Sequence, residues 1–148
     1  SVQAIRDADI VVIGPGSLYT SIIPNFLVDG ISEAIRSSGA VREYILNIMT
    51  QDGETDGYTG EDHVRALLEH AGGDVIDVCI ANNAPVPEKW LAPYRQEGVG
   101  PIEVDRAGIE ALGVAVREFP LCRPGRYIRH DADALSRAIL SVWREFEA

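Results

Sequence analysis

The stretch IGPGSLYTS, residues 13–21, places two glycines, one proline and four hydroxyl-bearing side chains directly after the apolar run DIVVI. Glycine lets a backbone approach an anion closely. Hydroxyl groups and free amide N–H groups at the start of a helix can hold phosphate oxygens without a net positive charge. The candidate donors in this stretch are Ser17, Tyr19, Thr20 and Ser21.

Several known site patterns do not fit this stretch. Its Gly-x-Gly-x-x-Tyr order lacks the third glycine of the dinucleotide-binding fingerprint, and it has no phosphate-binding lysine followed by Ser or Thr. Ser17 is not framed as Gly-x-Ser-x-Gly, which argues against a serine nucleophile. A tight strand-to-helix turn with a hydroxyl cap remains the alternative to an anion site.

A second polar loop, NIMTQDGETDGYTG, follows the apolar run EYIL. Asn47 and Gln51 are its best candidates for ligand contact, because amides both donate and accept hydrogen bonds toward a base or a sugar. Paired acids such as Glu54 and Asp56 could anchor Mg²⁺, since hard cations take oxygen ligands. A solvated turn with side-chain caps at Asp52 and Asp56 is the alternative.

A third polar loop, NNAPVP, ends the apolar run VIDVCIA. The amides of Asn82 and Asn83 could contact a ligand edge or could simply close the strand. In an open parallel sheet, ligands bind beyond the carboxyl ends of the strands. We therefore expect the three polar loops to converge on one edge of the sheet.

The histidines show no metal-ligand spacing and no neighbouring cysteine pair. We predict that His63 and His70 are solvated helix residues and that His130 lies beside a helix cap, with Arg126 and Arg129 as possible phosphate contacts. Trp90 and Tyr94, four residues apart, are interpreted as core packing.

Apolar patterns predict the elements that position these loops. Strands are expected at residues 9–14, 43–49, 75–81 and 114–119, and helices are expected where Leu27, Ile31 and Ile35, and then Val64 and Leu67, recur at helical spacing. Thr59 and Asp62 form a capping box, and Gly72 and Gly73 end that helix. A further helix is predicted over 87–96, a turn of helix up to residue 112, and a closing helix after the cap Asp131.

Strands that alternate with helices predict an α/β fold: a Rossmann-like three-layer αβα arrangement with a mainly parallel sheet. Residues 1–148 are expected to form a single α/β domain, because a chain of 148 residues can bury a full core. Cys79 and Cys122 are interpreted as small core residues or spare thiols. No repeat or linker divides the chain.

Composition limits the partners. The chain has 23 acidic and 13 basic residues and a formal charge of −10, which opposes binding to nucleic acid or anionic membranes. No run of about twenty apolar residues exists, so we expect no membrane insertion and a cytoplasmic location.

The motifs GPGSLYTSIIPN, NIMTQDGETDGYTGEDHV and NNAPVP, in this order, resemble the carboxyl-terminal half of bacterial gluconeogenesis factors, in the superfamily that includes phospholactate transferase. The resemblance covers about residues 4–140. Family members are expected to begin with a Gly-rich loop on a first strand, and this loop is absent here. The resemblance therefore implies that the chain is the carboxyl-terminal part of a longer protein.

The resemblance also implies a uridine-diphosphate-sugar or related nucleotide ligand and a regulatory role in carbon metabolism and cell shape. Carried over residue by residue, the phosphate end would be lined by Gly14, Gly16, Ser17, Leu18, Tyr19, Thr20 and Ser21. The sugar or base would be contacted by Asn47, Thr50, Gln51, Thr55, Asn82 and Asn83. Asp52 stands where family members often carry proline.

Three functions remain open from the sequence. The first is a nucleotide-sugar-binding regulatory protein with no resident metal, for which a homo-oligomer is one of the expected states. The second is a phospholactate-type transferase that acts on a deazaflavin acceptor with Mg²⁺. The third is a partner-binding domain. No residue shows the setting of a general acid or base, so the sequence leaves enzyme activity undecided.

Overall fold

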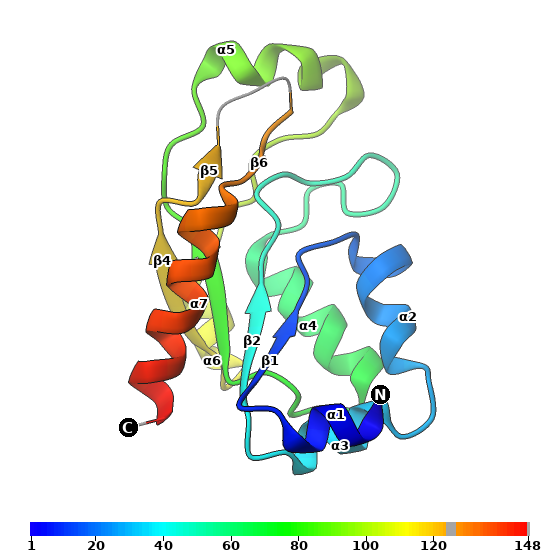
Figure 1. The fold of residues 1–148 in the computed structure, drawn as a ribbon. Helices are drawn as coiled ribbons and strands as arrows, with labels where there is room; N and C mark the ends of the chain where they lie inside the picture. Colours follow the sequence, from blue (N-terminus) through cyan, green and yellow to red (C-terminus); the bar gives the residue numbers. More distant parts are fainter. Residues whose placement is uncertain (124–126, 148) are drawn as a thin grey trace.

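Four short strands form one parallel sheet in the computed structural model of the chain, which describes residues 1–123 and 127–147 (Figure 1). They are β1 (Ile10–Ile13), β2 (Val41–Ile45), β3 (Val78–Asn82) and β4 (Ala115–Phe119), and they pair in the order β1-β2-β3-β4. All three pairings are parallel. The carboxyl ends of the strands therefore lie at one edge of the sheet, and the predicted α/β class is confirmed.

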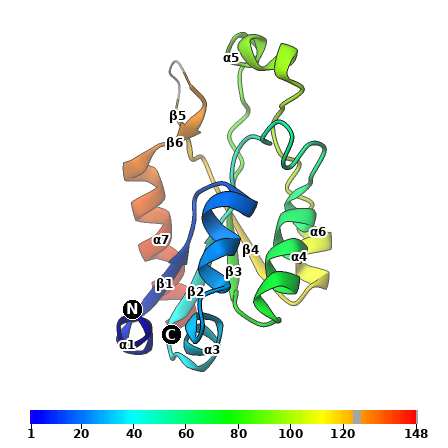
Figure 2. The same cartoon turned by 90° about the vertical axis from the view of Figure 1, so that its right-hand side faces the viewer.

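Helices cover both faces of this sheet (Figure 2). α2 (Ile23–Phe26), α4 (Gly60–Ala71) and α6 (Arg106–Ala111) lie on one face, and α7 (Ala132–Glu147) lies on the other. Successive residues of a strand point to opposite faces. In β2, Tyr44 accordingly joins the core under α4, whereas Ile45 joins the core under α7. α1 (Val2–Asp7) packs on α3 (Ile31–Ser37) at the far end of the sheet.

The predicted start and end of α4 are confirmed. The Thr59 hydroxyl accepts the Asp62 N–H at 3.2 Å, and the Asp62 carboxylate accepts the Thr59 N–H at 2.9 Å. Gly72 then ends the helix in the left-handed conformation, with φ of 84°. The cap of α7 is confirmed too, because Asp131 accepts the Ala134 N–H at 3.0 Å.

The single helix predicted across Leu27, Ile31 and Ile35 is wrong. The chain instead makes a π-helical turn (Leu18–Ile22) that runs into α2, leaves the helix at Leu27, and begins α3 at Ile31. Gly30 has φ of 85°, a left-handed conformation that cannot continue a helix. Leu27 therefore does not reach the core and is 68% exposed.

The later part of the chain also differs in detail from the prediction. The helix expected over 87–96 is divided into α5 (Glu88–Leu91) and the 3-10 helix η2 (Ala92–Glu97). Two short antiparallel strands, β5 (Cys122–Arg123) and β6 (Arg129–His130), were not predicted. Two residues are too few to show a period of two, which explains the omission.

Two further expectations can be compared with the structure. Cys79 is fully buried in the core, as predicted, and its burial raises the pKa of the thiol to about 12. In residues 1–123 and 127–147, none of the helices has both the length and the apolar character needed to cross a membrane.

Candidate functional site

The loops that follow β1 and β2 meet at the carboxyl edge of the sheet. The Asn47 side-chain amide donates to the Gly16 carbonyl at 2.8 Å, and the Gly16 N–H donates back to the Asn47 amide oxygen at 3.3 Å. The Gln51 amide donates to the Ser17 hydroxyl at 2.9 Å. These bonds fix the two loops against each other, 31 to 34 residues apart in sequence.

A cavity of about 530 Å³, which we call the loop cavity, opens beside these contacts. Its walls come from the first two loops and from two distant segments of the chain. The lining includes Gly16, Ser17, Ser21, Asn47, Thr50, Gln51, Tyr94, Arg129 and His130. A volume of this size fits a small-molecule ligand.

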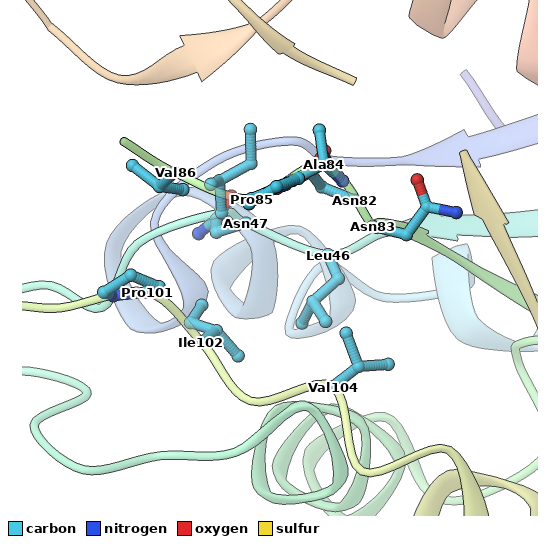
Figure 3. Close-up of a pocket in the computed structure, with 11 residues that line it drawn as sticks. Leu46, Asn47, Asn82, Asn83, Ala84, Pro85, Val86, Pro101, Ile102 and Val104 are labelled. Atoms are coloured by element: carbon cyan, nitrogen blue, oxygen red, sulfur yellow. Dashed lines mark hydrogen bonds between the residues drawn. The ribbon is translucent and has the colours of Figure 1, made fainter. Parts of the chain in front are cut away.

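A second and smaller hollow of about 180 Å³, which we call the asparagine pocket, adjoins the loop cavity (Figure 3). Asn47 and Ile48 line both of them. Asn82 and Asn83 lie on one side of the pocket, and Val104 lies on another. The third polar loop therefore reaches the same edge of the sheet as the first two.

Gly14 has a structural reason to be glycine. Its φ is 85°, and an added Cβ would lie 2.9 Å from the Ile22 side chain and 3.2 Å from the Ile45 carbonyl oxygen. Gly14 lines an apolar groove along β1 and not the loop cavity. It permits the turn that places Gly16 and Ser17 at the cavity.

The other residues of the first loop divide into two groups. Ser17 and Ser21 line the loop cavity, and the exposed Thr20 is not among the residues that line it. The Leu18 side chain is fully buried in the core, so it cannot line the cavity. The Tyr19 N–H is already used, because it donates to the Glu54 carboxylate at 2.8 Å.

Several predicted polar contacts of the other loops are also used within the protein. Thr50 exchanges hydrogen bonds with the backbone of Gly100, and the buried Thr55 hydroxyl accepts the Gln51 N–H at 2.9 Å. The Asn82 side-chain oxygen accepts three backbone N–H groups, from Ala84, Leu121 and Cys122. These three side chains hold the loops in place.

Gln51 and Asn83 differ in what they can offer a ligand. The Gln51 side-chain oxygen lies buried with no hydrogen-bond partner in the described part of the chain, and its amide nitrogen already donates to Ser17. Asn83 is exposed at the asparagine pocket. Ser17, Ser21 and Asn83 therefore form the accessible polar surface of the predicted site.

The strand β6 brings a cation to the loop cavity. Arg129 is the single formally positive side chain among the described residues that line the loop cavity or the asparagine pocket. The sequence named it as a possible phosphate contact, together with Arg126, which lies outside the described residues. Tyr94 also lines the cavity, so its interpretation as core packing is wrong, and its hydroxyl accepts the Ile128 N–H at 3.0 Å.

The donor set does not fit a metal held by the protein. None of the described residues that line the two hollows is a carboxylate, and no group of three or more Asp, Glu, His or Cys gathers within residues 1–123 and 127–147. Magnesium sites use carboxylates. Glu54 instead accepts from Tyr19, and Asp56 accepts the Gly53 N–H at 2.7 Å.

Two histidines hold the second loop and its helix. The prediction that His63 is solvated is wrong, because the ring is fully buried behind Tyr58. Its Nδ1 lies 2.8 Å from the Thr59 carbonyl and must carry the proton, because a carbonyl only accepts. The Nε2 of His130 donates in the same way to the Leu46 carbonyl at 3.1 Å.

We expect acid to destabilise the protein through these two rings. Burial is the main cause that lowers the pKa of His63 and of His130 below the ordinary 6.5. At these two rings the unfolded chain therefore binds protons first, and their contribution to the free energy of unfolding should fall as the pH drops below 6.5. The buried Glu43 contributes with the opposite sign over the same range. Urea unfolding between pH 8 and pH 5 measures this slope. His63→Asn keeps a donor near Nδ1 and should lose less stability toward acid than the wild type does. The same pH dependence in both proteins would contradict the assignment.

Comparisons with known proteins agree with the fold and with the family resemblance. The family model for the 2-phospho-L-lactate transferase CofD matches residues 1–122. The gluconeogenesis factor of Halalkalibacterium halodurans is 45% identical over 139 residues, which are 93% of this chain and 43% of that protein. The gluconeogenesis factor of Bacillus subtilis is 38% identical over 146 residues, which are 98% of this chain and 46% of that protein.

A solved structure gives the same result. The crystal structure of a member of the upf0052 family from Bacillus halodurans superimposes with a TM-score of 0.91 at 45% identity, and the match covers 94% of this chain and 45% of that one. This chain thus spans less than half the length of these relatives. The resemblance inferred from the three loop motifs is confirmed, and the chain belongs to the 2-phospho-L-lactate transferase CofD family.

Proposed function

We propose that the chain binds a nucleotide sugar of the uridine-diphosphate type and acts as a regulatory protein. The loop cavity is the observation that carries the proposal, because it combines hydroxyl and amide donors with one cation. The phosphates would lie between Ser17, Ser21 and Arg129. The sugar or base would extend past Asn47 and Gln51 toward Asn83 in the asparagine pocket.

The wider role rests on the relatives. Proteins 38% to 45% identical to this chain are named gluconeogenesis factors, and gluconeogenesis belongs to carbon metabolism. We propose that ligand binding in the cytoplasm reports the supply of nucleotide sugar and thereby affects carbon metabolism and cell shape. In this proposal the chain is the carboxyl-terminal part of a longer protein, to which the regulatory activity belongs.

Calorimetric titration with uridine diphosphate and with UDP-glucose tests the binding. We expect saturable heat for both ligands and an affinity for each that is reduced about two- to tenfold in Ser17→Ala, because one neutral hydrogen bond contributes about 0.5–1.5 kcal/mol. Ser37→Ala is the matched control, since Ser37 lies in α3 at the opposite end of the sheet. Absence of saturation by either ligand at millimolar concentration would refute the proposal.

A phospholactate-type transferase that acts on a deazaflavin acceptor is the second candidate, and the name of the matching family favours it. Phosphoryl chemistry requires negative charge to be neutralised at the reacting oxygens. The carboxylate-free lining of the two hollows gives a metal no anionic protein ligand. Product formation that depends on Mg²⁺ and is lost in Asp56→Asn would favour this candidate over the regulatory protein.

A further inference from the structure

Tyr19 is held from both ends behind the loop cavity. Its N–H donates to the Glu54 carboxylate at 2.8 Å, and its hydroxyl lies 2.8 Å from the Tyr58 hydroxyl. Tyr19, Glu54 and Tyr58 are not among the described residues that line the cavity. Their contacts therefore act on the back of the turn whose front carries Ser17 and Ser21.

The turn relies on these outside contacts because it is short and irregular. The Ser17 carbonyl accepts the N–H groups of both Ser21 and Ile22 at 2.9 Å, which closes a π-helical turn. The Tyr19 N–H points out of the turn, at the positive end of the short helical segment. A carboxylate is the strongest acceptor that a protein can offer to such a group.

Aromatic contacts connect the same turn to α4. The Tyr19 ring packs edge to face with Tyr58, at 6.3 Å between ring centres, and with His70, at 5.9 Å. Tyr58 packs in the same way on the buried His63, at 5.6 Å. Tyr58 directly precedes the capped first turn of α4, and its ring contact with His63 holds it against that helix.

We propose that Glu54 and Tyr58 are positioning residues that act through Tyr19 to hold Ser17 and Ser21 in the ligand-accepting arrangement. This inference rests on the proposed binding of a nucleotide at the loop cavity. It also assigns a direction to the ligand. The Tyr19 N–H already donates its hydrogen bond to the Glu54 carboxylate and cannot donate to a ligand. The phosphate of the ligand therefore binds on the side of Ser17 and Arg129, away from the acids of the second loop.

The test uses Glu54→Ala, Glu54→Gln and Tyr58→Phe, with two measurements on each protein. The rate of hydrogen exchange at the Tyr19 amide, measured by NMR without ligand, reports how firmly the Tyr19–Glu54 hydrogen bond holds the turn. Titration with uridine diphosphate reports its effect on binding. Asp52→Ala is the matched control, because Asp52 is an exposed acid of the same loop and its removal changes the net charge equally.

We expect faster Tyr19 exchange and about tenfold weaker binding in Glu54→Ala, since a hydrogen bond to a charged group is lost. Glu54→Gln keeps an acceptor and should restore binding to within about threefold of the wild type. Tyr58→Phe loses one neutral hydrogen bond and should weaken binding about threefold. Asp52→Ala should leave both measurements unchanged.

Three results would contradict the positioning role of Glu54 or the proposed function beneath it. Equal losses in Glu54→Ala and Glu54→Gln would show an effect of charge and would overturn the positioning role, as would a Tyr19 exchange rate that Glu54→Ala does not change. If the wild type itself does not bind uridine diphosphate, the proposed function fails. The exchange rates still decide, independently of that failure, whether Glu54 holds the turn.

Discussion

Glu43→Gln is expected to raise the free energy of unfolding by about 3 kcal/mol at pH 8.5, with a gain that shrinks toward zero as the pH approaches 4.5. Glu43 lies in the middle of β2, fully buried, and neither carboxylate oxygen has a hydrogen-bond partner in the described part of the chain. Its neighbours in the sheet are Val12 and Val78. Glutamine has the same shape and no charge.

The variant is expected to gain stability at high pH because of the direction in which the pKa of Glu43 is shifted. Burial raises the pKa of Glu43 from 4.5 to about 7. The folded state therefore holds the proton more tightly than the unfolded chain, so the stability present below pH 4.5 is lost as the pH rises through 7. The variant does not titrate at this position and keeps its stability.

Thermal unfolding between pH 5 and pH 8.5 measures the effect, and a gain of about 3 kcal/mol corresponds to a rise in Tm of about 6–12 °C for a chain of this size. Glu33→Gln, at an exposed position of α3, controls for the loss of one negative charge. Glu43→Met tests whether an apolar side chain does as well. A gain that is the same at every pH would show that ionisation is not its cause.

Arg129→Gln is expected to weaken the binding of uridine diphosphate about 10- to 100-fold, because a hydrogen bond to a charged group contributes about 1.5–3 kcal/mol. The protein carries a formal charge of −10, and Arg129 alone among the described lining residues opposes that charge at the ligand. Its guanidinium can contact two phosphate oxygens at once. Arg129 is exposed, so Tm should change little.

The control for this prediction lies on the neighbouring strand. Arg123 pairs with Arg129 across the β5–β6 ladder and is exposed, but it does not line the loop cavity. Calorimetry at two salt concentrations separates direct contact between Arg129 and the phosphate from long-range attraction of the ligand, since salt screens exposed charges. An equal loss of affinity in Arg123→Gln would mean that the local field, and not contact with Arg129, holds the ligand.

The sequence by itself determined the layout of the protein. Apolar runs such as VIDVCIA predicted buried strands, and the Thr59–Asp62 box located the start of α4. The strand predicted from DIVVI also forms, but it lies at the edge of the sheet and only Ile13 in it is buried. These signals are local, because a run of strand residues or a helix cap involves neighbours within a few positions. Once the strands are parallel and in chain order, the loops that follow them must lie at one edge, which is why the three motifs could be placed together.

Only the tertiary structure decided which polar side chains remain available to a ligand. The Thr50 side chain is hydrogen-bonded to Gly100, and the Asn82 side chain is hydrogen-bonded to Leu121 and Cys122. Arg129 reaches the cavity on a strand that no sequence pattern predicted. Each partner lies 39 to 50 residues away from the side chain that it binds. Hydrogen-bond satisfaction and burial depend on such distant contacts, whereas sequence patterns carry information about near neighbours.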